Sequence, residues 1–176
     1  MHTWLQRALF LVIATTIPDA WALSQPMNGI QIDLAAGAGG GGTPLTTGVG
    51  WQASASYWSG NYDSVYSLGR FWGIGATLRQ DYTAQGLRTA PMLEVRRGMD
   101  LIVVGITGHF SIGPVLDAGG LGGTIRAGLS TKLRRHAYWG LTLRLEGGVE
   151  LFEDRVGGQF GILLGGSFAR PFQKVQ

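Results

Sequence analysis

A histidine and a serine separated by one residue, His109 and Ser111, form the one enzyme-like pair in the sequence. A serine hydroxyl becomes a nucleophile when a neighbouring imidazole takes its proton. Glu146 or Glu150 could supply the third member of such a site. The competing interpretation is an ordinary interior histidine held by hydrogen bonds. No cluster in the chain has the spacing of metal ligands, so the sequence predicts no metal site and no cofactor.

Charged residues of both signs define a second candidate site. Glu94 and Arg96 lie two residues apart, as do Arg144 and Glu146. They belong to a longer series on one parity of a two-residue alternation: Asp33, Arg79, Arg88, Glu94, Arg96, Arg126, Lys132, Arg134, Arg144, Glu146 and Glu150. If that parity lines a closed interior, the charges must pair, because an unpaired buried charge is costly. We expect a network of Glu94, Arg96, Arg126, Arg144, Glu146 and Glu150. It could be a plug of ion pairs or a narrow charged path for ions.

The elements that carry these residues are predicted to be strands. Apolar residues recur with a period of two, which places successive side chains on opposite faces of a strand. The alternation restarts eight times, near residues 30–38, 47–58, 68–80, 87–98, 100–112, 122–134, 138–152 and 157–172. Turn-forming residues separate the segments. The pattern predicts an all-β protein: an eight-stranded antiparallel up-and-down transmembrane β-barrel, with an even strand number as in bacterial outer-membrane barrels.

The volume of the two faces indicates which of them points outward. The apolar parity carries many large side chains, whereas the other parity is rich in glycine and serine, as at Gly48, Gly50, Ser54 and Ser56. The interior of an eight-stranded barrel is only just wide enough to be filled by side chains, so the large apolar residues would not fit inside it. We therefore expect the apolar face outside, in contact with lipid. A secreted, lipid-binding soluble barrel is the alternative.

The N-terminus predicts export. Arg7 precedes an apolar run at residues 8–17, which Pro18 ends, and Ala20-Trp21-Ala22 matches a signal-peptidase pattern. The run is too short for a membrane-spanning helix. We expect a signal peptide at residues 1–22, cleaved after Ala22, and one barrel domain at residues 23–176. The chain has no cysteine, and its net charge of +3 is too small to indicate nucleic acid binding.

On these features the chain resembles the small eight-stranded outer-membrane β-barrels of the OmpA/OmpX type. The resemblance covers the mature sequence and is one of pattern. It implies an outer-membrane location, contact with outer-membrane lipids and lipopolysaccharide, and insertion by the barrel-insertion machinery through the last strand. Phe168 and Phe172 match the aromatic insertion signal, although residues 173–176 follow it here. The function expected is a structural or weakly conducting barrel with a charged lumen.

A second resemblance supports the alternative of a lipid A-modifying hydrolase. Outer-membrane lipid A deacylases are similar in size and use a His-x-Ser pair with a Glu, which His109, Ser111 and Glu146 would match. This chain departs from that pattern, because the Asn after the serine is Ile112 and the pair lies on the fifth strand. Moreover, Phe110 and Ile112 share the apolar parity, so His109 and Ser111 should face the lumen. The predicted outer loops (39–46, 81–86, 113–121 and 153–156) are shorter than adhesins and receptors usually present.

Overall fold

The alternation of apolar with small or charged residues produces eight long strands and no other regular element in the part of the chain that the structure describes. That structure, a computed structural model, describes residues 25–42, 46–62, 69–101, 104–136 and 139–172. The strands are β1 (Gln25–Gly42), β2 (Thr46–Tyr62), β3 (Gly69–Thr83), β4 (Gly86–Leu101), β5 (Val104–Asp117), β6 (Gly120–His136), β7 (Trp139–Leu151) and β8 (Val156–Pro171). The predicted signal peptide lies outside the described residues.

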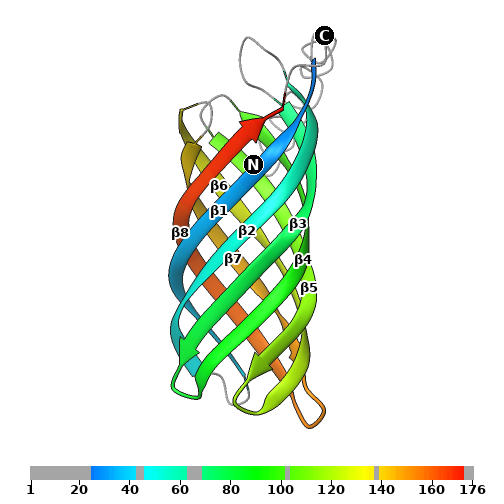
Figure 1. The fold of residues 1–176 in the computed structure, drawn as a ribbon. Helices are drawn as coiled ribbons and strands as arrows, with labels where there is room; N and C mark the ends of the chain where they lie inside the picture. Colours follow the sequence, from blue (N-terminus) through cyan, green and yellow to red (C-terminus); the bar gives the residue numbers. More distant parts are fainter. Residues whose placement is uncertain (1–24, 43–45, 63–68, 102–103, 137–138, 173–176) are drawn as a thin grey trace, which may run out of the picture.

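The eight strands form a closed antiparallel up-and-down barrel, which confirms the predicted fold class. Each strand pairs with its neighbour in sequence, and β8 closes the barrel on β1 (Figure 1). No helix among the described residues is long and apolar enough to cross a membrane.

The register of the ladders sets the tilt of the strands. Following directly paired residues once around the barrel from Ile30 in β1 leads back to β1 at Gly40, ten residues farther along. Such a stagger goes with strands that are tilted by about 35–45° to the barrel axis. The tilt brings inward side chains from different strands to one height, so residues far apart in sequence can meet in the lumen.

The strand boundaries differ from the predicted ones where glycines and aspartates looked like turn residues. The glycines from Gly39 onward continue β1, because they pair with β2 and β8. The predicted boundary between the segments at residues 87–98 and 100–112 lies within β4. The connection between β3 and β4 shrinks to Ala84 and Gln85, and Gly86 has a positive φ of 113°. The strands therefore reach farther toward both ends of the barrel; we call the end opposite the two termini the hairpin end.

The two faces of the wall differ as predicted. Among the described residues, 33 large apolar side chains are exposed and point outward, whereas only six hydrophobic residues are buried. Five of the buried ones form small groups at the two ends of the lumen, and the sixth, Leu163 of β8, lies between these groups, opposite Arg144 of β7. Ala90, Met92 and Val115 pack together near the hairpin end, and Trp58 packs edge-on against Tyr62 near the other end. Polar and charged side chains fill the lumen between these groups.

Candidate functional site

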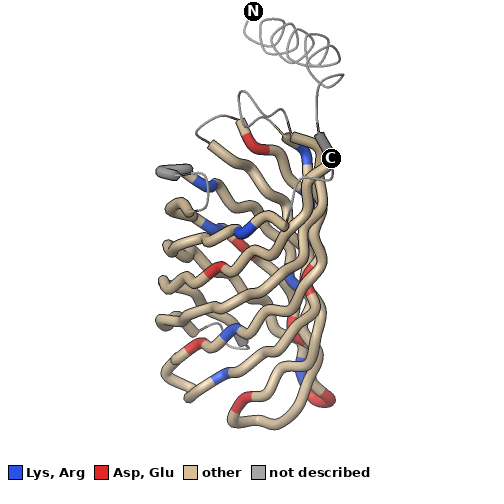
Figure 2. Tube along the Cα trace, turned by 45° about the horizontal axis from the view of Figure 1, so that its top comes forward, with Lys and Arg blue, Asp and Glu red and all other residues tan. Residues whose placement is uncertain are grey.

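Inward positions on six of the strands carry most of the charged side chains of the barrel. Acidic and basic positions are spread along its length rather than gathered at its ends (Figure 2). Together with Arg155, from the turn between β7 and β8, they form one connected set of ion pairs, which we call the lumen network. Its members are Asp33, Arg79, Asp81, Arg88, Glu94, Arg96, Asp117, Arg126, Arg144, Glu146, Glu150 and Arg155. The exposed Asp154, which lies 3.8 Å from Arg155, is outside the lumen and is not counted among them.

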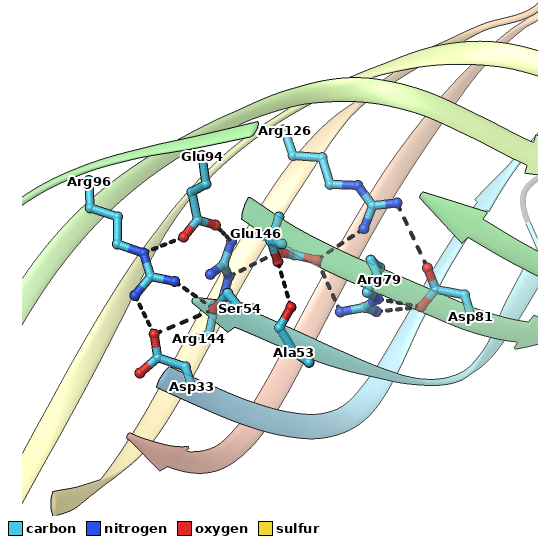
Figure 3. A network of polar contacts seen from close by, with 11 residues as sticks. Asp33, Ala53, Ser54, Arg79, Asp81, Glu94, Arg96, Arg126, Arg144 and Glu146 are labelled. Carbon is cyan, nitrogen blue, oxygen red and sulfur yellow. Dashed lines mark hydrogen bonds and ion pairs between the residues drawn. The ribbon is translucent and has the colours of Figure 1, made fainter. Parts of the chain in front are cut away.

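Glu146 is the centre of the lumen network, because its carboxylate accepts hydrogen bonds from three arginines (Figure 3). Arg79 Nη1 lies 3.1 Å and Arg126 Nη1 3.3 Å from Glu146 Oε1, and Arg144 Nε lies 3.0 Å from Oε2. The three donors come from β3, β6 and β7, so this one carboxylate joins distant parts of the wall. Hydrogen bonds to charged groups are roughly twice as strong as neutral ones.

From Glu146 the lumen network continues toward the end of the barrel where β1 begins. Arg144 Nη2 donates to Glu94 Oε2 at 2.6 Å, and Arg96 pairs with both Glu94 and Asp33. Arg96 Nη2 also donates to Ser54 Oγ at 2.6 Å. Both carboxylates therefore have a guanidinium partner, which offsets the cost of removing them from water.

In the other direction the lumen network reaches the hairpin end. Arg126 lies between Asp81 and Glu150, with nitrogen–oxygen distances of 3.8 and 3.6 Å. Arg88 links Glu150, at 3.2 Å, to Asp117, at 3.7 Å. Arg155 closes the series by donating to Asp117 from Nη2 at 2.9 Å. The chain of ion pairs thus runs from Asp33 in β1 to the turn after β7.

The lumen network is electrically balanced. Six of its described members are arginines and six are carboxylates. Nine of them are buried, with Arg79 at 1% and Glu150 at 0% relative exposure. Every guanidinium group of the network therefore has a carboxylate partner. Chemically the network suits a closed interior better than an ion-selective filter, which uses rings of one sign of charge.

His109 and Ser111 also point into the lumen, and both are buried. Their direct partners across β5 and β4 are Arg96 and Glu94, respectively. Neither His109 nitrogen nor Ser111 Oγ makes a hydrogen bond with any residue that the structure describes. The structure thus brings the pair to the level of Glu94 and Glu146 without joining it into a hydrogen-bonded triad. In the described ranges, no group of three or more potential ligands could hold a metal ion.

A glycine provides the space that His109 needs. A Cβ added at Gly128, the partner of His109 on β6, would lie 2.6 Å from His109 Nε2. The same Cβ would lie 2.1 Å from the backbone oxygen of Leu145, so a larger residue at this position would clash with β7 as well as with the imidazole. Glycine on the inward parity is therefore required at this point by the width of the barrel, as the narrow-lumen argument from the sequence implies.

The structure places all six residues of the expected network in the lumen network, along with Asp33, Arg79 and Arg88. Lys132 is half-buried near the end of β6, and the side chain of Arg134 lies outside what the structure describes. The sequence reasoning missed Asp81, Asp117 and Arg155, because they were assigned to loops. Asp81 shares its parity with Arg79, and that signal could have identified it.

A further feature that the sequence did not predict is a cavity of about 170 Å³ at the hairpin end. It lies between the turns that follow β3, β5 and β7. Its charged lining residues, Arg88, Asp117 and Arg155, are the last members of the lumen network. The cavity is therefore the outer limit of the charged interior, and its cations already have carboxylate partners.

Comparison with other proteins adds no assignment of function. No family model matches the sequence, and no functionally described protein matches it either. Among solved structures, a de novo designed transmembrane β-barrel is 14% identical, with a TM-score of 0.37, over 82% of this chain and 95% of the other. Ail, the attachment invasion locus protein of Yersinia pestis, is 10% identical, with a TM-score of 0.27, over 82% of this chain and 99% of the other. The fold assignment therefore rests on the register and closure of this chain itself.

Proposed function

We propose that this protein is an integral outer-membrane β-barrel whose lumen is closed by the lumen network, and that it serves a structural role without conducting ions. The observation that carries the proposal is the combination of an apolar outward face with a continuous, charge-balanced series of ion pairs along the interior. The two halves of this proposal, membrane location and closure, rest on different features.

Membrane location is supported by the outward face. Soluble monomers rarely expose continuous apolar patches larger than a few hundred Å². Here the exposed apolar residues surround the whole barrel; every strand contributes, for example Leu34 of β1, Leu93 of β4 and Leu129 of β6. In a bilayer the same surface would be in contact with acyl chains, and the closed ladder leaves no unpaired strand edge.

The outer membrane is the location that suits an exported barrel. The N-terminal segment has the features of a signal peptide, and an even number of strands puts the two ends of the barrel domain on one side. We assign that side to the periplasm. Phe168 on the outward face of the last strand and the exposed Phe172 directly after it are then placed where the insertion machinery would recognise them, and the hairpin end faces lipopolysaccharide.

Closure is supported by the filling of the lumen. A permeating ion would have to displace pairs such as Arg144–Glu94 and Arg79–Glu146, which are almost completely removed from solvent. Breaking a buried pair leaves an uncompensated charge, which is strongly unfavourable. An open path for ions would need a break in this series of ion pairs. Among the described residues, however, the series is continuous from Asp33 to Asp117.

The test is a planar-bilayer recording of the refolded protein. We expect the wild type to be silent, and small openings to appear in Glu146→Gln, because the three arginines around that residue would lose their shared carboxylate. Glu153→Gln, in the exposed turn after β7, is the matched control and should be silent. Steady conductance of the wild type, with an ion preference that shifts on Arg144→Glu, would establish the ion path instead.

The hydrolase alternative gains no support from the geometry, because His109 and Ser111 are enclosed by the barrel wall and a lipid substrate lies outside it. Mass spectrometry of lipid A from cells with and without the protein decides this point. A change in acylation that Ser111→Ala abolishes would make the protein an enzyme and overturn the structural role.

A further inference from the structure

The cavity at the hairpin end is built by three separate turns. The turns after β3, β5 and β7 meet around it, at the lower end of the barrel in Figure 1. Its polar lining consists of Thr83, Gln85 and Arg88 from the first hairpin, Asp117 from the second and Arg155 from the third. At about 170 Å³ the cavity has roughly ten times the volume that one water molecule needs, and it is smaller than the pockets of drug-sized ligands. A ligand that fits it is therefore about the size of one small ring.

Small residues in two of the turns keep this space open. Gly86, Ala118 and Gly119 line the cavity beside the polar residues. Gly86 has a positive φ of 113°, a conformation that strains residues other than glycine. A Cβ added at Gly119 would overlap with the guanidinium nitrogens of Arg155. Larger side chains at these positions would thus fill or deform the cavity.

The polar groups that face the cavity are held in place by their neighbours. The guanidinium carbon of Arg155 lies 4.1 Å from the centroid of the Phe152 ring. Arg155 Nη2 donates to both carboxylate oxygens of Asp117, at 2.9 and 3.0 Å, and the backbone N–H of Gly119 donates to Asp117 Oδ1 at 2.8 Å. Asp117 and Arg155 are therefore ordered before a ligand binds, which lowers the entropy cost of binding.

Both side chains retain capacity for further hydrogen bonds. A guanidinium group has five N–H donors, and a carboxylate has about four acceptor positions. Among the described residues, Nε and Nη1 of Arg155 make no hydrogen bond; Nη1 lies 3.8 Å from the exposed Asp154. Arg88 Nη2, at 3.7 Å from Asp117 Oδ2, is too distant for a hydrogen bond. Asp117 and Arg155 can therefore bind a ligand as acceptor and donor without breaking their own ion pair.

The lining disfavours two classes of ligand. It contains no large apolar side chain, so an acyl chain would find no apolar contacts there. Each arginine already has a carboxylate partner, Asp117 for Arg155 and Glu150 for Arg88, so a free anion would have to displace one of them. An uncharged ligand with neighbouring hydroxyl groups suits the lining, because each hydroxyl can accept from a guanidinium group and donate to a carboxylate. A sugar ring has this chemistry.

We propose that the cavity at the hairpin end binds one uncharged sugar ring, with Asp117 accepting hydrogen bonds from its hydroxyl groups and Arg155 donating to them. Gln85, exposed at the rim, adds an amide that can donate and accept. The sugar part of lipopolysaccharide and a free saccharide both offer such a ring. The site itself does not depend on the proposed structural role; only the first of these sources rests on the proposed orientation, in which the hairpin end faces lipopolysaccharide.

The experiment is an NMR titration of the isotope-labelled, refolded protein in an amine-oxide detergent, which contains neither sugar nor phosphate. The probes are the methyl glycosides of glucose, galactose and mannose, with inorganic phosphate for comparison. We expect at least one glycoside to shift the amide signals of Gly86 and Gly119 with a dissociation constant of about 1 mM, as for a small ligand held by a few hydrogen bonds. The amide of Gly105, near the other end of the barrel, should not shift.

Two pairs of variants test the assignment of the site. Asp117→Asn should weaken glycoside binding about tenfold, because the ligand loses a charged acceptor, whereas Asp154→Asn, in the exposed turn beside the cavity, should not change it. Ala118→Trp should block the cavity while its polar groups remain. Ala84→Trp is the matched control, because Ala84 is exposed in a neighbouring turn and does not line the cavity.

Several results would overturn the site. No shift with any of the glycosides would refute it, and phosphate binding as tight as that of the best glycoside would show an anion site. Unchanged binding in Ala118→Trp, or an equal loss in Ala84→Trp, would place the sugar elsewhere. Because the titration in detergent needs no bilayer, a failure of the proposed membrane location leaves this test intact.

A second titration, in lipid nanodiscs with and without lipopolysaccharide, identifies the source of the sugar. If lipopolysaccharide shifts the same amides and prevents the shift by the glycoside, its sugar part is the ligand. If the glycoside binds equally well in both kinds of nanodisc, the ligand is a free saccharide. Either result supports the cavity as a sugar site.

Discussion

Glu146→Gln should lower the free energy of unfolding by about 3–5 kcal/mol, the cost of breaking a buried ion pair by removing one partner. The carboxylate serves Arg79, Arg126 and Arg144 together, so its loss leaves three guanidinium groups with fewer partners in the lumen. Urea unfolding of the barrel in lipid vesicles, followed by tryptophan fluorescence, measures the change.

Two further variants separate a paired network from general sensitivity of the interior. Glu153→Gln removes the same charge from an exposed turn and should change stability by less than about 0.5 kcal/mol. Glu146→Gln combined with Arg126→Met should cost less than the sum of the two single changes, because groups in one network are not additive. A loss in Glu146→Gln no larger than that in Glu153→Gln would show that the ion pairs do not hold the lumen together.

Leu143→Arg should lower the free energy of unfolding in vesicles by about 2–4 kcal/mol, because it places a charge near the middle of the lipid-facing surface. Leu143 lies in the middle of β7, points outward and is 43% exposed. Its neighbours across the ladder on the β8 side include Leu164, so no polar group on that side would receive the guanidinium. The same unfolding assay applies.

Leu121→Arg is the matched change at a different depth. Leu121 is 70% exposed and lies one residue after the start of β6, at the hairpin end, where a charge reaches the headgroups and should cost only about 0–1 kcal/mol. If the outward face were in water, both substitutions would be nearly neutral. Equal costs at the two positions would therefore contradict a membrane-spanning barrel.

The fold could be predicted from the sequence because its main signal is periodic. The two-residue alternation fixes which residues share a face, and the volume of the apolar set excludes it from a narrow lumen. Strand ends were predicted less well. Asp81 and Asp117 are turn-forming residue types, but each continues the inward parity of its strand and pairs with an arginine there. The local propensity of aspartate favours a turn at both positions, but ion pairs with arginines in the lumen keep both residues within their strands.

The candidate site was predictable as a set of residues but not as a geometry. Parity alone assigns Glu94, Arg126 and Glu146 to the lumen. Which of them pair depends on the stagger of the barrel. That stagger is the total of the register shifts between neighbouring strands in all eight ladders. The convergence of three arginines on Glu146 therefore needed the structure.

The central claim, a closed barrel embedded in the outer membrane, is tested most directly by fractionating Gram-negative cells that express the full chain. The protein should be recovered with outer membranes after a urea wash. It should migrate faster on a gel when unboiled than when boiled, because a closed barrel resists detergent until it is heated. Recovery as a soluble periplasmic protein whose mobility does not change on boiling would contradict the account.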